Sequence, residues 1–278
     1  MTQLGMAVSA AVLLASLSFT SAGQTSDDSA APMPNYVAPV QAPGQISNPS
    51  SPVQSQLTQE DLADILMARK EYHDAAISYK KLASEHPKNA IYWNKLGIAL
   101  HQQEDLQSAL KSYQQAIKVN PQYADAQNNI GTIWYQRKKF GKAIRAYERA
   151  IKLRSDMAVL YSNLGYAYFG EKKYQESIAA FHQALTLDPQ LFERASSRAG
   201  SLLQDRSVTD RGRFYFLLAK SYADAGNYER CLIYLRKAKE EGFGAMNDVK
   251  TDPSFSALLK LPETQEILAP RAPDAPLH

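Results

Sequence analysis

Cysteine and long apolar runs are both scarce in this 278-residue sequence. The single cysteine, Cys231, excludes an intramolecular disulfide. The apolar run from Ala7 to Phe19 is too short to span a bilayer, and no cysteine follows it to carry a lipoprotein anchor. We therefore expect no stable membrane span once a signal peptide has been cleaved.

Positive charge is missing from the first part of the chain, where no Lys or Arg precedes Arg69. The formal net charge of +3 is too small to indicate a nucleic-acid partner by itself. Arg137, Lys138 and Lys139 form a local basic patch that could contact nucleic acid. Favourable placement of cations against a helix dipole explains the patch more simply, so we predict no nucleic-acid partner.

Motifs that would carry catalysis or bind a cofactor are also absent. The sequence has no glycine-rich phosphate loop, no G-x-S-x-G, no H-E-x-x-H and no paired cysteine motif. The histidines are scattered, and none pairs with another His or Cys at metal-ligand spacing. We predict no catalytic residue, no metal site and no cofactor, and a protein that is not an enzyme.

Two segments before the repeats are predicted to be non-globular. Five small residues stand at the end of the apolar run and after it, which is typical of a secretory signal peptide over residues 1–23 (Ser18, Thr20, Ser21, Ala22 and Gly23). An uncleaved anchor or a wrongly chosen start codon is the alternative. Residues 24–55 hold six prolines among Ser, Gln and Ala, which predicts a disordered linker. We expect an exported protein, periplasmic or secreted.

A 34-residue repeat fills the middle of the chain. Gly97, Gly131 and Gly165 are 34 residues apart, and Ala63 stands one period earlier. An apolar residue precedes each of them, and an aromatic residue recurs later in each unit (Leu62, Leu96, Ile130 and Leu164; Tyr79, Tyr113, Tyr147 and Phe181). This spacing predicts two antiparallel amphipathic helices per unit.

The glycines need a physical reason, because glycine within a helix costs about 0.5–1 kcal/mol relative to alanine. We predict that small residues at the Gly165 and Ala184 positions let the helix backbones approach closely. Large residues at the Tyr168 and Phe181 positions would then fill the space beside them.

The pattern resembles the tetratricopeptide repeat. The second unit carries the match most fully, through Trp93, Leu96, Gly97, Ala109, Tyr113, Ala116 and Pro121. The resemblance implies an all-α fold, a right-handed α-solenoid of antiparallel helix pairs (the tetratricopeptide superhelix), with units 1–4 over residues 56–191.

The register then slips by 20 residues. We predict a connector over 192–211, a fifth unit over 212–245, a C-terminal helical cap over 246–268 and a disordered tail over 269–278. Asp252 and Pro253 form a helix N-cap signal. Five nearby apolar residues are expected to cover the last unit (Phe255, Leu258, Leu259, Ile267 and Leu268). This ending is similar to those of uncharacterised secreted bacterial proteins with these repeats.

In this family the first helices of the units line a concave groove that holds a peptide or a partner's helix. By position, the resemblance implies a peptide-binding groove of Asn94, Asn128, Asn129, Tyr135, Asn163, Tyr166, Phe169, Arg213 and Lys220, with an acidic end at Glu60, Asp61 and Asp64. Asn129 and Asn163 match the asparagine ladder that holds a peptide backbone in some members, whereas Asn94 is one position off. The charge difference between the groove's two ends would orient an extended ligand.

Together these features predict a non-catalytic protein–protein interaction scaffold or assembly factor of the cell envelope. It would bind a partner protein or peptide in the groove. One alternative is a structural subunit of an envelope secretion or pilus-type complex, held through its convex face and C-terminal cap. The other is a regulatory partner of an enzyme in another chain.

Overall fold

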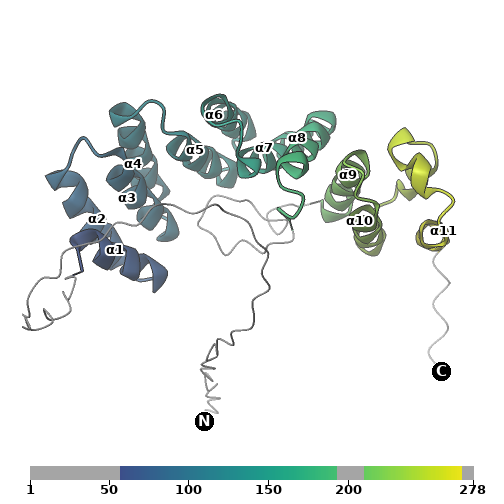
Figure 1. Cartoon of the computed structure of the whole chain (residues 1–278), viewed down its shortest axis with the longest axis horizontal. Helices are drawn as coiled ribbons and strands as arrows, with labels where there is room; N and C mark the ends of the chain where they lie inside the picture. The colour runs from purple at the N-terminus through teal and green to yellow at the C-terminus, as the bar shows by residue number, and fades with distance from the viewer. Residues whose placement is uncertain (1–56, 193–209, 271–278) are drawn as a thin grey trace, which may run out of the picture. The chain divides into compact units, whose positions relative to one another are not determined.

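A computed structural model of the chain describes residues 57–192 and 210–270 (Figure 1). The elements are α1 (Gln59–Ala68), α2 (Tyr72–Glu85), α3 (Ala90–Gln102), α4 (Leu106–Val119), α5 (Ala124–Gln136), α6 (Phe140–Leu153), α7 (Ala158–Gly170), α8 (Tyr174–Leu187), α9 (Arg211–Asp224), α10 (Tyr228–Glu240), the 3₁₀ helices η2 (Met246–Lys250) and η3 (Pro253–Leu258), and α11 (Pro262–Leu268). The predicted signal peptide and linker, and most of the connector and of the tail, lie outside the described residues and stay predictions.

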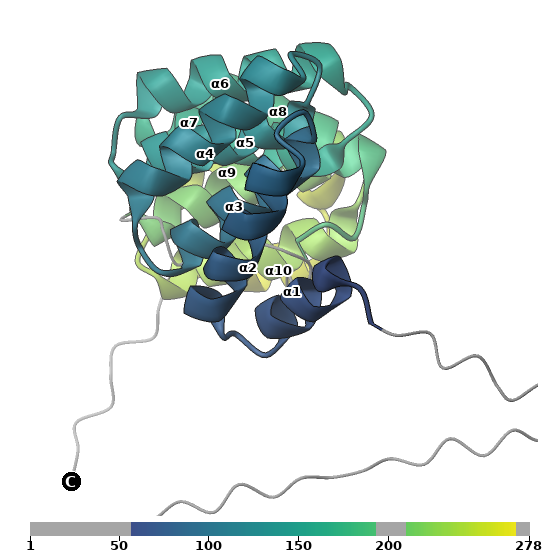
Figure 2. The same ribbon diagram turned by 90° about the vertical axis from the view of Figure 1, so that its left-hand side faces the viewer.

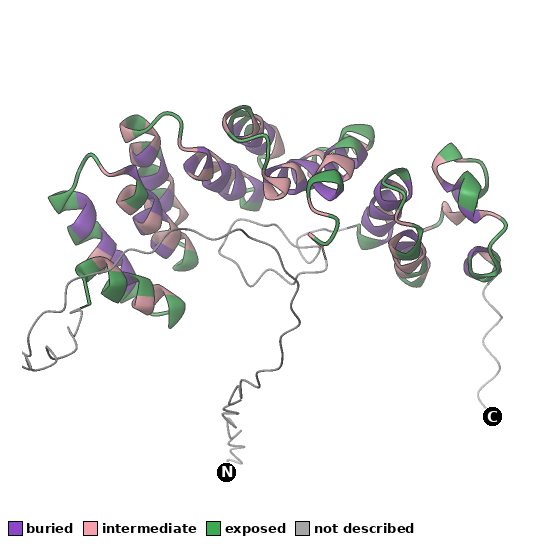
Figure 3. Ribbon diagram, in the orientation of Figure 1, coloured by how far each residue is buried: buried purple, intermediate pink, exposed green. Residues whose placement is uncertain are grey.

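Helices α1–α10 form five consecutive pairs, and each second helix also packs on the first helix of the next pair. Thus α2 contacts α3, α4 contacts α5, α6 contacts α7 and α8 contacts α9. Figure 2 views the same pairs from the side of α1 and α2. In Figure 3, buried residues lie on helix faces turned toward neighbouring helices and exposed residues lie on the outer faces. The predicted all-α solenoid is confirmed for the part of the chain that the structure describes.

Rings from the second helices lie directly against glycines of the first helices. A Cβ added at Gly131 would lie 2.5 Å from the Tyr147 ring, and one at Gly165 would lie 2.6 Å from the Phe181 ring. Both rings are fully buried. A larger side chain would have to displace a packed ring, which is costly in a close-packed interior. The predicted packing of a ring against each glycine is confirmed at these positions.

The turn inside each pair depends on one residue in the left-handed region. These residues are Lys70, Glu104, Lys138, Lys172 and Gly226, with φ between 54° and 74°. Only the fifth pair uses glycine there, although other residues adopt this conformation at a cost of about 1–2 kcal/mol. The first four turns therefore lack the glycine that usually marks a helix C-terminus.

The C-terminal elements cover the fifth pair. The Asp252 side chain accepts a hydrogen bond from the Ser254 backbone N–H at 3.0 Å, and Pro253 is the first residue of η3. Phe255 and Leu258 are fully buried, and the Phe255 ring lies 5.6 Å from that of Phe216 on α9. The predicted cap is therefore present, although two of its three helices are short 3₁₀ helices.

Candidate functional site

Polar contacts join the first helices of consecutive pairs at a spacing of 35 residues, one more than the repeat. Asn129 Nδ2 donates to Asn94 Oδ1 at 3.0 Å, and Asn163 Nδ2 donates to Asn128 Oδ1 at 3.0 Å. All four asparagines are at most 5% exposed. A buried amide is costly unless it is hydrogen-bonded. The two pairs therefore stabilise the packing of α3 on α5 and of α5 on α7.

This pairing gives the asparagines of the predicted ladder partners within the fold. Alignment at 34 residues made Asn129 and Asn163 equivalent and set Asn94 apart, whereas the structure pairs Asn94 with Asn129. Successive units of a solenoid are rotated relative to each other, so a residue faces the position one further along in the next first helix. These amides have a structural role in the fold, and their contact with a peptide backbone stays a prediction.

The series of polar pairs stops at α7. Ser162 occupies the position of Asn94 and Asn128 in the fourth unit. Ser162 Oγ is fully buried and has no hydrogen-bond partner. The fifth pair therefore packs on the fourth without the amide contact that joins the earlier pairs.

Three aromatic residues predicted to face an open groove belong to the core instead. The Tyr166 ring stacks on the Phe214 ring of α9 at 5.2 Å, and the Phe169 ring meets Phe214 edge-on at 5.7 Å. Tyr135 packs edge-on against Phe140 at 5.4 Å. The three predicted residues are at most 7% exposed. Their groove-facing placement is wrong because Tyr166 and Phe169 pack the fourth pair against the fifth, and Tyr135 packs α5 against α6 within the third.

The predicted basic end of the groove is neutralised by carboxylates. Lys220 Nζ lies 2.5 Å from Asp252 Oδ2, and both side chains are less than one fifth exposed. Although burial opposes it, the Lys220 ammonium holds the pKa of Asp252 below its usual value. Arg213 forms an ion pair with Asp210 at 3.1 Å. The predicted charge gradient therefore lacks a free positive end at these two residues.

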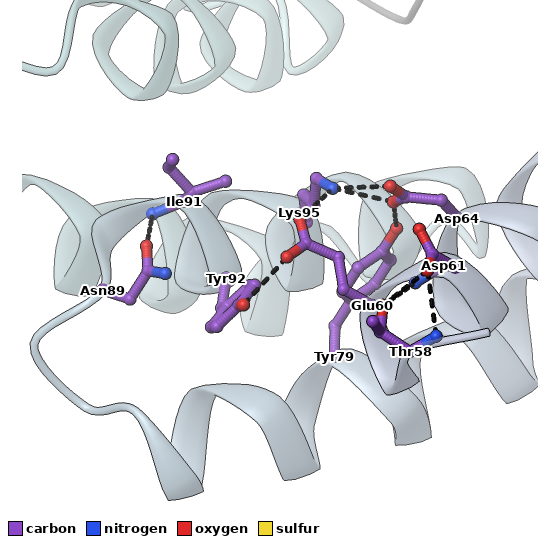
Figure 4. A network of polar contacts seen from close by, with 9 residues as sticks. All are labelled: Thr58, Glu60, Asp61, Asp64, Tyr79, Asn89, Ile91, Tyr92 and Lys95. Carbon is purple, nitrogen blue, oxygen red and sulfur yellow. Dashed lines mark hydrogen bonds and ion pairs between the residues drawn. The ribbon is translucent and has the colours of Figure 1, made fainter. Parts of the chain in front are cut away.

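The predicted acidic end, by contrast, is a connected surface cluster on α1–α3 (Figure 4). Lys95 Nζ lies 2.8 Å from Glu60 Oε1 and 2.8 Å from Asp64 Oδ1. The Tyr92 hydroxyl donates to Glu60 Oε2 at 2.8 Å, and the Tyr79 hydroxyl donates to Asp64 Oδ1. We call these five residues, together with Asp61, the acidic cluster.

Asp61 belongs to the cap of α1. Its backbone N–H donates to Thr58 Oγ1 at 3.1 Å, and its side chain accepts from the Thr58 backbone N–H at 2.9 Å. Glu60 and Asp64 retain 37% and 48% side-chain exposure, and Asp61 is exposed. The cluster therefore holds three accessible carboxylates and one ammonium, that of Lys95, which contacts Glu60 and Asp64, and it keeps an excess of negative charge.

Hydrogen bonds favour the charged form of the Glu60 and Asp61 carboxylates. Those from Lys95 and then Tyr92 lower the pKa of Glu60, and those from Thr58 lower the pKa of Asp61. The bond to Glu60 in turn raises the pKa of the Tyr92 hydroxyl. The cluster is therefore anionic at neutral pH, with its tyrosines protonated as donors.

An open hollow of about 650 Å³ adjoins the acidic cluster. It is lined by residues 86–92 with Val119 and Asn120, so Tyr92 belongs to both features. Ile91 is 48% exposed there, and the His86 ring lies 5.7 Å from the Tyr92 ring. The surface thus offers carboxylates beside a partly apolar hollow.

The residue that sequence reasoning missed at this site is Lys95, which organises the cluster. Its signal was present, because Lys95 follows Glu60 by 35 residues, the same spacing as the asparagine pairs. A search at the repeat period of 34 does not find it.

In residues 57–192 and 210–270, none of the helices combines the length and apolar character needed to cross a bilayer. The same ranges hold no group of three His, Cys, Asp or Glu residues able to bind a metal ion.

Comparison with known families gives a consistent match along the five pairs. Tetratricopeptide repeat models match residues 60–114 and 102–158, residues 158–191, and residues 212–241. Each described helix pair therefore has a match, and the family assignment depends on these repeat models. No curated protein matches the sequence.

Several solved structures are similar to this chain. MamA from Desulfovibrio magneticus RS-1 (residue 41 to the end) has 18% identity, coverage of 70% of this chain and 96% of that one, and a TM-score of 0.48. A crystal structure of MamA has 21% identity, coverage of 68% and 98%, and a TM-score of 0.47. YrrB, titled a TPR protein with an unusual peptide-binding site, has 17% identity, coverage of 69% and 89%, and a TM-score of 0.45.

Proposed function

We propose that the chain, which belongs to the tetratricopeptide repeat family, is a non-catalytic scaffold that holds a basic segment of a partner protein at the acidic cluster. The observation that carries this proposal is the charge excess there. Glu60, Asp61 and Asp64 are accessible carboxylates. Within the cluster the Lys95 ammonium is their one positive charge, and it pairs with Glu60 and Asp64. Accessible like charges attract an oppositely charged segment and set its orientation.

The neighbouring hollow supports a two-part contact. A Lys or Arg side chain of the partner would meet Glu60 and Asp64, and an apolar side chain next to it would enter the hollow beside Tyr92 and Ile91. Rim charges act mainly on the association rate and are screened by salt. Burial of the apolar side chain would supply affinity that salt does not weaken.

The asparagine pairs are not part of this proposed contact surface. Asn94 and Asn128 each accept a hydrogen bond from the next first helix, and opening these contacts would leave buried carbonyl oxygens without donors. We therefore assign recognition of the partner to the acidic cluster on α1–α3.

The place of action that we propose is the cell envelope. The apolar run at residues 7–19 and the small residues after it support export, and the predicted cleavage lies after Ala22 or Gly23. The intact mass of the protein purified from its native host tests this part. A mass that still includes the first 22 residues would overturn it.

Photocrosslinking in the native host tests the binding surface. A photoreactive amino acid replaces Ile91, which is 48% exposed in the hollow, and a matched variant carries it at Ile77, 58% exposed on α2. We expect a discrete adduct at position 91 that Glu60→Gln with Asp64→Asn reduces. Neutralising Glu240 and Glu263, two exposed carboxylates elsewhere, should leave it unchanged.

The purified partner segment, identified from the adduct by mass spectrometry, then allows a kinetic test. We expect the Glu60→Gln with Asp64→Asn variant to slow association, and the difference from wild type to shrink at high salt. Equal association rates at low salt would show that the acidic cluster does not recognise the partner.

The alternative function, a structural subunit held through its second helices, has one observation in its favour. Ile77 is exposed on α2 where the next two units carry Lys111 and Arg145. An adduct at position 77 with none at position 91 would favour the subunit.

A further inference from the structure

The turn between α5 and α6 carries a concentration of positive charge that the other turns lack. Residues 137–142 contain Arg137, Lys138, Lys139 and Lys142 and no carboxylate. In the equivalent six-residue windows, charges balance at 69–74, 171–176 and 225–230, and residues 103–108 contain two acids and no base. The repeat architecture itself therefore does not require these cations.

Three of the cations gather around one aromatic ring. Lys142 Nζ lies 4.6 Å, Arg137 Cζ 5.6 Å and Lys139 Nζ 5.8 Å from the ring centre of Trp134. The charged groups are consequently within about twice these distances of one another, close enough for mutual repulsion at low salt. Contact with the indole face offsets part of that repulsion.

These cations have no carboxylate partner in the described part of the chain. All four are exposed, and none forms an ion pair there. This distinguishes them from Lys95, Arg213 and Lys220, which are each paired. The turn thus presents an uncompensated positive surface.

The backbone that carries the charges is firmly packed. The Phe140 ring lies against the Tyr135 ring on one side. On another side it lies so close to Gly170 of α7 that a Cβ added there would be 2.5 Å from the Phe140 ring. Lys138 holds the left-handed conformation, and its N–H donates to the Tyr135 carbonyl at 2.8 Å. A fixed backbone lowers the entropic cost of presenting several charges to one ligand.

We propose that the Trp134 turn, defined as Trp134 with residues 137–142, is a second interaction surface that binds an acidic segment of a protein. Carboxylates of closely spaced Asp or Glu side chains would pair with Arg137, Lys139 and Lys142. This surface goes beyond the proposed function, because its charge is opposite to that of the acidic cluster and it lies on a different pair of helices.

The surroundings favour a short acidic segment over a long polyanion. The preceding turn, residues 103–108, carries Glu104 and Asp105, and it is linked to this region by the contact of His101 Nε2 with Gln136 Oε1 at 2.9 Å. Nucleic acid or an anionic membrane would extend its negative charge over those acids as well. A segment with a few carboxylates fits within the one turn.

Fluorescence anisotropy with the full chain tests the surface. The probe is a fluorescein-labelled peptide with four consecutive glutamates between Gly-Ser flanks, and its matched control has glutamines instead. We expect saturable binding of the glutamate peptide that weakens with salt, and none of the glutamine peptide. The variant Arg137→Gln with Lys139→Gln and Lys142→Gln removes the three cations that would pair with the peptide's glutamates. Because each such pair is exposed to solvent, the loss of all three should weaken binding about tenfold.

A matched variant removes equal charge from equivalent turns: Lys70→Gln, Lys172→Gln and Lys173→Gln. It should bind within about twofold of wild type. Reversing the three cations of the Trp134 turn to Glu, in a Glu60→Gln with Asp64→Asn background that removes charge from the acidic cluster, should produce binding of a tetralysine peptide that this background alone lacks. That gain of binding would show that the turn still forms a binding surface in the variant, and far-UV circular dichroism would check its folding.

Several results would overturn the proposal. One is absence of saturable binding, and another is equal weakening by the two charge-removing variants, which would mean nonspecific attraction. A third is tighter binding to single-stranded DNA or to phosphatidylglycerol vesicles than to the glutamate peptide, with the same dependence on Arg137, Lys139 and Lys142. That result would assign the turn to a different class of partner.

Discussion

Replacing glycine by alanine should have opposite effects at Gly131 and Gly141. Both glycines lie within helices, where alanine is favoured by up to about 1 kcal/mol. A Cβ at Gly131 would lie 2.5 Å from the buried Tyr147 ring, whereas one at Gly141 would meet nothing within 4 Å. The difference in stability therefore reports ring packing rather than helix propensity.

The expected magnitudes follow from these surroundings. At Gly131 the Tyr147 ring, fully buried and hydrogen-bonded through its hydroxyl to Thr132, has to move. Overpacking of this kind costs about 1–3 kcal/mol, more than the propensity gain. Gly131→Ala should thus lower the free energy of unfolding by about 1–2 kcal/mol, and Gly141→Ala should raise it by about 0.4–1 kcal/mol.

Thermal and urea unfolding followed by far-UV circular dichroism would measure both variants against wild type. A change of 1 kcal/mol corresponds to about 2–4 °C in Tm for a domain of this size. Because repeat arrays can lose cooperativity, the urea m-value has to stay constant for the comparison to hold. Tyr147→Leu should lower the free energy of unfolding less in the Gly131→Ala background than in wild type, because the added Cβ then has room. Equal stabilisation by the two alanines would refute the packing argument.

Three further predictions concern polar groups that are buried or, for His101, half-buried. Asn129→Ala should lower the free energy of unfolding by about 1–3 kcal/mol, because Asn94 Oδ1 then lacks its donor; urea unfolding measures this, and unchanged stability would show that the pair contributes nothing. Burial raises the pKa of the Cys231 thiol to about 12, so a maleimide should label it only after unfolding, and rapid native labelling would contradict its burial. Burial also lowers the pKa of His101, so the unfolded chain binds the proton more readily and stability should fall as pH drops below about 6.5. His101→Gln should flatten that pH dependence in thermal unfolding, and an identical pH profile would exclude His101 as its source.

The repeat and the fold class could be predicted from the sequence because both depend on local chemistry. Small and aromatic residues recurring every 34 positions predict which helix faces are buried, and Gly131 with Tyr147 and Gly165 with Phe181 meet as that pattern requires. The Asp252–Pro253 signal likewise predicts the start of η3, since a cap involves only residues near in sequence.

The candidate site could be predicted only in part. The acidic residues Glu60, Asp61 and Asp64 are accessible as expected from their polar character. The contact of Lys95 with Glu60 and Asp64 could not be predicted from the 34-residue period. That contact depends on how the second unit is rotated relative to the first.

The sequence by itself determined where the helix pairs lie and which rings meet which glycines. Only the tertiary structure decided which polar residues remain accessible. Asn129 and Asn163 pair with asparagines 35 residues earlier, and Lys220 pairs with Asp252 of the cap. The physical reason is that a helix period identifies the side chains that share a face, whereas their partners across helices depend on the rotation and displacement between units.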